Sequence, residues 1–275
     1  MEGDEASARA LQLVVEITHT KFITLGLKCM ILLPVEERKQ FTIIFTGSIT
    51  QQTGSEYPLV DWIQKNPKTL QILIDFYRHP ELAVCAGEML RLCVKHKVLA
   101  SQLLTKESLD TLFSFFSVSH FDVSADSFAT FRELILKAPQ AKDFLQNNSQ
   151  NIIDRLHNSL DETNYAACRQ SLKLIGEIIS EYESFRNAYL SNEQNLIKIM
   201  KLMSSSYHNI SLEAFHVFKL FVVYEHKPET VLKILRANAD KLIEYIHELV
   251  QNNPDQELEN EKEHLIVQIQ TIKMR

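Results

Sequence analysis

A thirteen-residue pattern that returns at nearly fixed intervals constrains this chain more than any other feature. Four windows align without gaps, at intervals of 41, 44 and 43 residues: LAVCAGEMLRLCV from Leu82, VSADSFATFRELI from Val123, ACRQSLKLIGEII from Ala167 and ISLEAFHVFKLFV from Ile210. In each window the fifth residue is small, the ninth is large and apolar, and the twelfth is apolar, which is the spacing of one face of an amphipathic helix. Because such a helix cannot bury its apolar face alone, we expect the four to pack against one another.

The length of this period indicates the fold. Repeats of roughly 40 to 47 residues built from two or three helices are typical of armadillo and HEAT arrays. The sequence therefore predicts an all-α protein, a right-handed α-solenoid of armadillo/HEAT-like repeats that forms a single domain over 1–275. We expect repeats near 58–95, 98–137, 139–180 and 183–224, followed by capping helices over 227–275.

Some details of this layout can be checked directly. The third repeat is expected to hold three helices, at 140–146, 149–159 and 162–180. The polar segment 251–263 is expected to be a solvated connector that leads into a closing helix over 257–273. The small fifth residues of the windows should be buried where helices touch, because larger side chains would overpack those contacts. They are Ala86, Ser127, Ser171 and Ala214.

Composition and charge limit the partners and the compartment. A net charge of −6 argues against a general nucleic-acid or anionic-membrane surface, because both need a strong basic field. The four cysteines form no CxxC pair, which favours reduced thiols in a cytoplasmic protein. The first residues are acidic where a signal peptide would be basic, and no segment reaches the ~18 unbroken apolar residues of a membrane span. We therefore expect a cytoplasmic protein without nucleic-acid binding or membrane insertion.

No motif of an enzyme or a cofactor site is present in the sequence. The glycine-rich dinucleotide and phosphate loops, the nucleophile elbow, the HExxH zinc motif and the calcium-binding EF-hand loop are all missing. The ten histidines are scattered, and none shares a helical face with a second histidine and a carboxylate. His216 is the most conspicuous, but a histidine on such a helix is usually a packing or surface residue. We therefore predict no catalytic residue, no metal and no cofactor.

Basic side chains recur on the windows away from the small residues. They occupy the third, seventh and tenth window positions as Arg91, Arg132, Arg169, Lys173 and Lys219. If the four helices stack side by side, these cations form a ladder that lines a concave, partner-binding groove. The alternative is that they are ordinary solvated positions of surface helices.

Aromatic side chains recur near the starts of the same helices. Phe121, Tyr165 and Tyr207 come at or just before successive inner helices, and Phe185 opens the helix after the third window. Aromatic anchors beside arginines are typical of protein-interaction hot spots, so we expect these four to cluster at one rim. The alternative is that they are staples between neighbouring repeats.

Several longer blocks give the sequence a family resemblance. FDVSADSFATFREL, RQSLKLIGE, EAFHVFKLFV and the C-terminal KLIEYIHEL and EKEHLIVQIQTIK closely resemble the mouse-protein-twenty-five family, also called calcium-binding protein thirty-nine. The resemblance runs from about Ile44 to the C-terminus. It implies a non-catalytic scaffold whose concave face binds and activates a sterile-twenty-type kinase or pseudokinase. It also implies a pocket for that partner's Trp-Glu-Phe-type tail and, in animals, a liver-kinase-type third subunit.

The resemblance also assigns residues. It places the concave contacts on Phe121, Tyr165, Arg169, Lys173 and Phe185, and it places the tail pocket on Met200 and Lys241.

This chain departs from the family pattern at two places near those residues. The lysine of the tail pocket is Lys198 here, one place after the family's position, which is Ile197, and one residue turns a helical side chain by about 100°. The family's basic residue before Phe185 is replaced by Tyr182, which lies between Glu181 and Glu183. The expected tail pocket therefore comprises Met200, Lys198 and Lys241, and the rim near Phe185 is more acidic than the family pattern.

A second function class remains open. An armadillo-type transport or assembly adaptor that binds basic targeting peptides needs a ladder of tryptophans and asparagines along an acidic groove. This chain has one tryptophan, Trp62, which lies outside the aligned windows, and its expected groove is basic.

Overall fold

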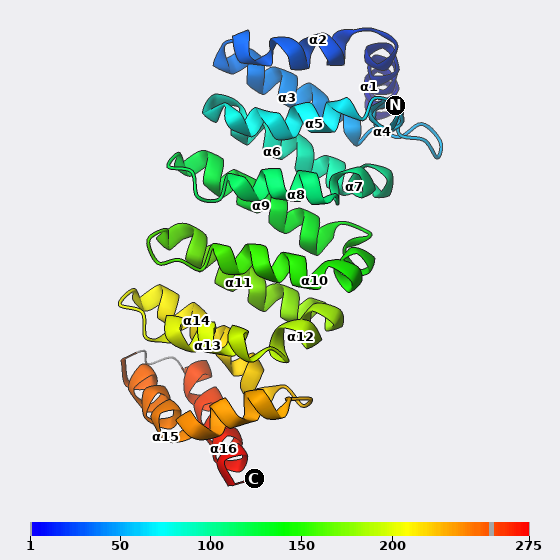
Figure 1. Ribbon diagram of the computed structural model, residues 1–275. Coiled ribbons are helices and arrows are strands. Elements are labelled where there is room, and N and C mark those ends of the chain that lie inside the picture. The colour runs from blue at the N-terminus through cyan, green and yellow to red at the C-terminus, as the bar shows by residue number, and fades with distance from the viewer. Residues whose placement is uncertain (1, 253–255, 275) are drawn as a thin grey trace. The chain divides into compact units, whose positions relative to one another are not determined.

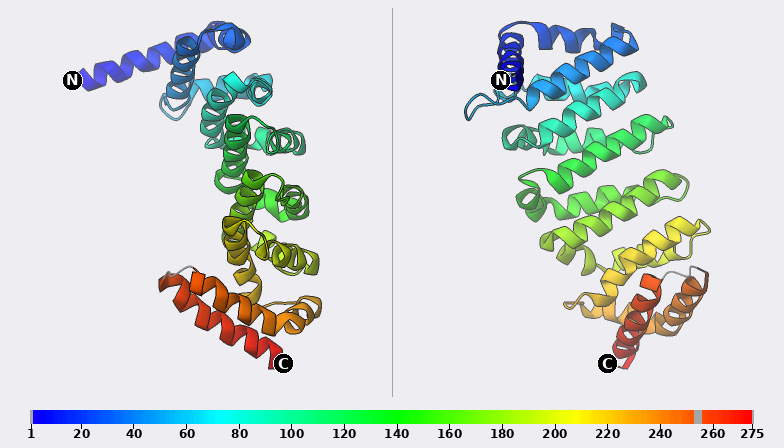
Figure 2. Two further views of the ribbon diagram at one scale, coloured as in Figure 1. Left: turned by 90° about the vertical axis from the view of Figure 1, so that its left-hand side faces the viewer. Right: turned by 180° about the vertical axis from the view of Figure 1, so that it is seen from behind.

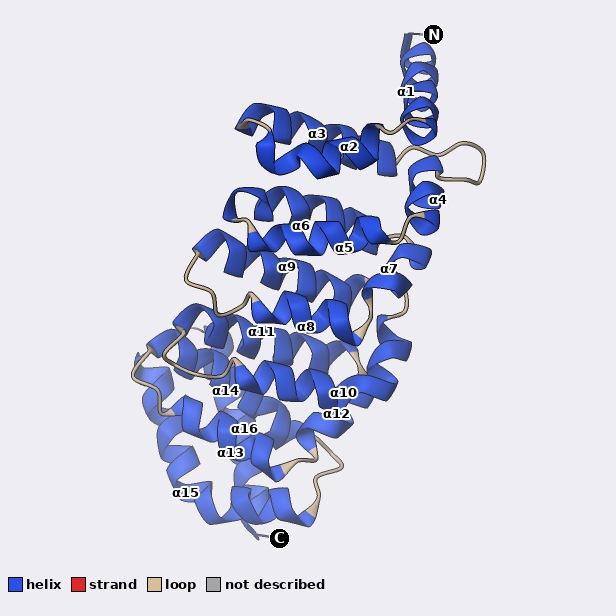
Figure 3. Cartoon of the chain, turned by 45° about the horizontal axis from the view of Figure 1, so that its top comes forward, coloured by secondary structure: helices blue, strands red, loops and turns tan. Residues whose placement is uncertain are grey.

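The computed structural model describes residues 2–252 and 256–274, and its regular elements over those ranges are helices (Figures 1 and 3). This confirms the predicted all-α class. The described chain forms sixteen α-helices and two short 3-10 helices, η1 and η2. The helices group into two compact units, Met1–Asn147 and Asn148–Arg275, and the boundary falls inside helix α10. The expectation of one domain over 1–275 stays a prediction, and each unit is described by itself.

Unit 1 is built from helices packed in two layers (Figure 2). Helix α6 packs between α3 and α9, while α5 contacts α6 and α8 contacts α9. Helix α1 packs on α4, which also contacts α3 and α7. The bounds are α1 Glu2–His19, α2 Phe22–Cys29, η1 Met30–Leu32, α3 Val35–Ile49, α4 Pro58–Lys65, α5 Lys68–Asp75, η2 Phe76–Arg78, α6 Pro80–Val94, α7 Lys97–Leu103, α8 Lys106–Ser114 and α9 Phe121–Lys137.

Unit 2 repeats the same arrangement and ends in a helical pair. Helix α11 packs against α14, and α12 and α13 connect them along the chain. Helices α15 and α16 pack along one another, with α15 also touching α13 and α16 touching α14. The bounds are α10 Ala141–Asn158, α11 Tyr165–Glu181, α12 Glu183–Leu190, α13 Glu193–Met203, α14 His208–Val223, α15 Glu229–Asn252 and α16 Gln256–Met274.

The repeated windows lie on the helices that pack side by side within each unit. They fall on α6 and α9 in unit 1 and on α11 and α14 in unit 2. All four small fifth residues are 0% exposed, as predicted: Ala86, Ser127, Ser171 and Ala214. The large ninth residues are equally buried: Leu90, Phe131, Ile175 and Phe218. A small residue beside a large one lets neighbouring helices approach closely, so the sequence period and the packing period coincide.

Short-range chemistry sets the ends of these helices. Pro58 and Pro80 stand at the first turn of α4 and α6, where a missing backbone N–H costs nothing. Side-chain oxygens of Thr105, Asn164 and Asn192 accept hydrogen bonds from backbone N–H groups at the starts of α8, α11 and α13. These caps satisfy donors that have no partner inside the helix.

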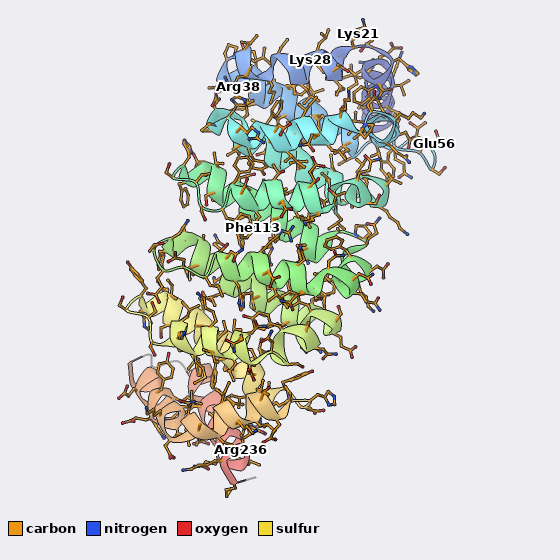
Figure 4. The ribbon with its side chains drawn as sticks, viewed as in Figure 1. Lys21, Lys28, Arg38, Glu56, Phe113 and Arg236 are labelled. Carbon is orange, nitrogen blue, oxygen red and sulfur yellow. The ribbon has the colours of Figure 1, made fainter. Side chains whose placement is uncertain are left out.

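Three arginines donate hydrogen bonds to backbone carbonyl groups near the C-terminal ends of helices. Arg38 donates to the carbonyls of Met30 and Ile31 at 3.2 and 3.0 Å, and Arg236 donates from Nε to the carbonyl of Ile272 at 3.2 Å (Figure 4). Arg186 donates to the last carbonyls of α11, those of Ile179 and Ser180, both at 2.7 Å. A guanidinium suits this position because it supplies several donors and a positive charge to the negative end of a helix.

Two expectations about the layout are wrong. The third repeat was expected to hold three helices, but 140–146 and 149–159 belong to the single helix α10, whose Ser149 is buried in the core rather than placed in a turn. The expected connector 251–263 is helical over 256–263, because α16 begins at Gln256, and the closing helix expected over 257–273 is confirmed as α16. Residues 253–255 of that connector lie outside the described residues.

Candidate partner-binding site

The first cation of the expected ladder is held by a polar network inside unit 1. The guanidinium of Arg91, on α6, donates to both carboxylate oxygens of Asp126, on α9, at 3.0 and 3.1 Å. Arg91 also donates to the Thr130 hydroxyl at 3.0 Å, and the Tyr77 hydroxyl donates to Asp126 at 2.7 Å. The side chains of Arg91 and Asp126 are only 26% and 13% exposed. Burial raises the pKa of Tyr77, so its hydroxyl stays protonated as a donor.

A glycine makes room for this network. Gly87 lies on α6 one turn before Arg91, and a Cβ built on it would stand 1.6 Å from Oδ1 of Asp126 and 2.5 Å from Nη1 of Arg91. No side chain fits at those distances without moving the ion pair. Gly87 therefore lets the two inner helices of unit 1 approach until the bidentate pair can form. Arg91 serves to join α6 to α9.

The other expected residues of unit 1 lie on α9. Phe121 opens the helix and is 72% exposed, so its ring is accessible to a partner. Arg132, one turn before the end of α9, is half-buried. In unit 1 the ring of Phe121 is thus accessible, whereas the side chains of Arg91 and Arg132 are partly buried.

The cations of unit 2 meet a single carboxylate. Arg169 Nε lies 3.3 Å and Lys173 Nζ 3.5 Å from the same oxygen, Oε1 of Glu213 on the neighbouring helix α14. The two cationic side chains are 38% and 50% exposed, whereas Glu213 is 14% exposed. Two positive charges thus share one carboxylate, and both cationic side chains are accessible to a partner.

Two tyrosines stand beside these cations. Tyr165, at the start of α11, and Tyr207, just before α14, have their ring centres 5.5 Å apart, and Asn209 donates to the Tyr165 hydroxyl at 3.0 Å. Both rings remain accessible. Lys219, farther along α14, stands over the ring of Phe215 at 5.8 Å. The pair of tyrosines, Arg169 and Lys173 form one surface on α11 and α14, named here the cationic face.

Phe185 does not belong to this surface. It is 0% exposed, and its ring stacks on that of Tyr189 at 5.8 Å between centres. Tyr189 is itself buried, and its hydroxyl lies 2.8 Å from Nε2 of His157. The expectation that Phe185 contacts a partner at the rim is therefore wrong for this conformation: the side chain is part of the core of unit 2. Helix α12 begins two residues earlier and turns Phe185 inward.

Lys198 faces this same region. Burial and the nearby Lys198 ammonium together lower the pKa of His157 to about 4, so His157 is neutral at physiological pH. The Lys198 charge also acts on Asp161 and Cys168, which lie near the start of α11. Lys198 itself is half-buried on α13.

The other two residues of the expected tail pocket lie elsewhere. Met200 is half-buried on α13, two residues after Lys198, and two helical residues differ in direction by about 200°. Lys241 is exposed on α15, which packs on α13. Leu196, Ile199, Leu202 and Met203 are buried, as core spacing predicts. The structure thus keeps Met200 and Lys241 as candidates and separates Lys198 from Met200.

Unit 2 also has a hollow of about 330 Å³ at the far end of α11. It is lined by α12 and by the end of α14, with Arg186, Asn187 and Tyr224 among its polar groups. Tyr224 donates to the side chain of Asn187 at 2.9 Å, so part of the polar lining is already satisfied. The hollow includes none of Met200, Lys198 and Lys241.

Sequence reasoning missed the two carboxylates that partner the cations. Asp126 and Glu213 each occupy the fourth position of their window, and each pairs with cations of the window before it. The corresponding positions of the other two windows hold Cys85 and Gln170. The sequence signal was a pair of positions in successive windows. One window has a basic third or tenth residue, and the next window has an acidic fourth residue.

Comparison with known proteins places this chain in a family. The family model described as Mo25-like matches residues 1–273. The chain belongs to the Mo25-like family. This confirms the family that the sequence blocks indicated, and membership agrees with the helical-repeat architecture of the two units.

Relatives of this family occur in several kingdoms. "Calcium-binding protein 39-like" of Homo sapiens is 34% identical over 276 residues, which cover 99% of this chain and 82% of that protein. "Mo25-like protein" of Schizosaccharomyces pombe is 35% identical over 244 residues, covering 87% and 74%. The crystal structure of an engineered protein is 13% identical with a TM-score of 0.52, covering 91% of this chain and 97% of that one, and shows likeness of fold alone.

One of these names refers to calcium. Among the side chains that the structure describes, no group of three or more His, Cys, Asp or Glu is placed to hold a metal ion. A calcium site needs six to eight oxygen ligands. A search of the same residues for a helix long and apolar enough to cross a membrane also finds none.

Proposed function

We propose that this protein is a non-catalytic scaffold that binds and activates a sterile-twenty-type protein kinase or pseudokinase. Family membership carries the proposal, because the family resemblance implies this activity. The observation that supports it in this chain is the cationic face of unit 2, where Arg169 and Lys173 share one carboxylate beside two accessible tyrosines. Such a surface suits a folded protein partner.

The physical role of a scaffold of this kind is to bind one conformation of its partner more tightly than another. A kinase with open and closed states shifts toward the closed, active state only by the difference in affinity for the two. Helical repeats packed around fixed contacts offer a stiff template for that selection. We propose that Tyr165, Arg169, Lys173 and Lys219 of unit 2 contribute contacts to the kinase, and that Phe121 and Arg132 of unit 1 contribute contacts of their own.

The remaining parts of the assembly follow the family resemblance. We propose that Met200 and Lys241 receive a Trp-Glu-Phe-type tail of the partner, because a half-buried methionine suits an aromatic ring. Lys198, which faces His157, is not part of that pocket in this proposal. We further propose that a liver-kinase-type protein joins the assembly as a third subunit and that the protein acts in the cytoplasm.

The test is the association rate with a purified sterile-twenty-type kinase domain, measured by surface plasmon resonance at low and at physiological salt. Arg169→Glu with Lys173→Glu is expected to slow association by about tenfold at low salt, and by less at higher salt, because exposed charges mainly steer encounter and are screened over ~8 Å. Lys201→Glu with Lys233→Glu is the matched control, since it makes the same charge change at two other exposed lysines of unit 2. Equal slowing by both double variants would remove the cationic face from the proposal.

A further inference from the structure

Unit 1 has an open hollow that the proposed function does not use. It has a volume of about 430 Å³ and lies where the end of α2 meets the α4–α5 turn. Its charged lining is Lys28 from α2 (Figure 4), Lys65 from the last turn of α4 and Lys68 from the first turn of α5. Three lysines thus line one hollow in a chain whose net charge is −6.

These lysines differ from the ladder cations in their partners. Within the described part of the chain, no carboxylate pairs with Lys28, Lys65 or Lys68, although Asp61 stands one turn before Lys65 on α4. Arg91 and Arg169, by contrast, are held by carboxylates of the neighbouring helices. Like charges that gather without a counter-charge repel one another, so a bound anion is stabilising there.

The walls of the hollow add apolar and hydrogen-bonding groups. The half-buried indole of Trp62 lines it together with Leu27 and Ile72, which gives a flat apolar surface among the charges. Thr69 also lines the hollow and is only 4% exposed, and its hydroxyl has no hydrogen-bond partner among the described residues. Such a hydroxyl is available to a ligand.

We propose that this hollow binds an acidic peptide segment that carries an apolar side chain between carboxylates. The apolar side chain lies against Trp62, the flanking carboxylates meet the three lysines, and one peptide carbonyl accepts from Thr69. Lysines supply point charges that suit separate carboxylates, whereas phosphate recognition favours the bidentate fork of arginine, which this hollow lacks. The site belongs to unit 1 and gives the scaffold a docking surface besides the cationic face.

Trp62 makes the test site-specific, because it is the chain's one tryptophan. The full-length protein is titrated with the blocked hexapeptide Asp-Glu-Leu-Leu-Glu-Asp and with its uncharged counterpart Asn-Gln-Leu-Leu-Gln-Asn, following indole fluorescence and calorimetric heat. The acidic peptide is expected to shift the emission of Trp62 and to bind at least about tenfold more tightly than the amide peptide, since three exposed ion pairs contribute a few-fold each.

Matched variants separate the hollow from the overall charge. Lys28→Gln, Lys65→Gln and Lys68→Gln together are expected to lower the affinity for the acidic peptide by about tenfold. Lys106→Gln, Lys137→Gln and Lys142→Gln remove the same charge from exposed lysines elsewhere in unit 1 and should leave it unchanged. Equal binding of the two peptides, equal loss in both triple variants, or no change in Trp62 emission would overturn the proposal. Displacement of the peptide by equimolar inorganic pyrophosphate would assign the hollow to phosphate instead.

Discussion

The two units treat the same sequence feature in opposite ways. In unit 1 the ladder cation Arg91 binds both oxygens of Asp126 inside a network with Tyr77 and Thr130. In unit 2 Arg169 and Lys173 reach one oxygen of Glu213 at 3.3 and 3.5 Å and are 38% and 50% exposed. A basic residue at a repeated position is therefore a structural clamp in one unit and an accessible surface in the other. Gly87 contributes to this difference, because a Cβ at that position would occupy the place of the Asp126 carboxylate.

The largest expected difference between the units is the cost of removing each carboxylate. Asp126→Ala should lower the free energy of unfolding by about 3 kcal/mol, because it leaves the guanidinium of Arg91 with its charge partly buried and unpaired. Glu213→Ala should cost less than about 1 kcal/mol, since its partners are solvated. Urea unfolding followed by circular dichroism measures both losses in free energy of unfolding. Similar losses would contradict the distinction between a structural ion pair in unit 1 and an accessible one in unit 2.

The sequence alone predicts which helices carry the repeated cations, but not which carboxylates pair with them. Periodicity located the window helices, which are α6, α9, α11 and α14 in the structure, because apolar spacing reports which side of a helix faces the core. It could not report distances between helices, so the pairing of Asp126 with Arg91 was missed. The burial of Phe185 was missed for the same reason: a residue near the start of a short helix points inward or outward according to the packing of α12 against α11.

The continuity of α10 shows another limit. The expected break between 146 and 149 coincides with Asn147 and Asn148, and asparagine favours turns. In the structure α10 runs through this point, the side-chain amide of Asn147 donates to the carbonyl of Asp143 at 3.3 Å, and Ser149 is buried. Tertiary packing here outweighs local preference, which is weak for any single residue.

The next prediction concerns the glycine that shapes the clamp. Gly87→Ala should destabilise the protein by about 1–3 kcal/mol, because the new methyl group displaces the Asp126 carboxylate. Gly176→Ala is the control on α11 of unit 2, where the nearest atom to an added Cβ is 4.0 Å away. That change should stabilise by about 0.5–1 kcal/mol, the usual advantage of alanine in a helix. Melting temperatures that shift in the same direction for both variants would contradict the steric account of Gly87.

The smallest expected effect compares two serines at the fifth window position. Ser127 in unit 1 donates to the carbonyl of Ser124 at 3.0 Å, whereas the buried hydroxyl of Ser171 in unit 2 has no hydrogen-bond partner among the described residues. Ser171→Ala should therefore stabilise by about 1 kcal/mol, and Ser127→Ala should be neutral or destabilise by a similar amount. Thermal unfolding of the two variants tests this, and a loss of stability in Ser171→Ala would show that its hydroxyl has a partner after all.

Glu213 also acts as a filter on what the cationic face can bind. A partner that offers a single carboxylate only exchanges one ion pair for another, so it gains little over the carboxylate already in place. A partner that brings several negative charges, or that fits the two tyrosines as well, gains more than it displaces. We therefore expect the carboxylate of Glu213 to weaken the binding of simple anions and small acidic metabolites more than that of extended, multiply charged protein surfaces.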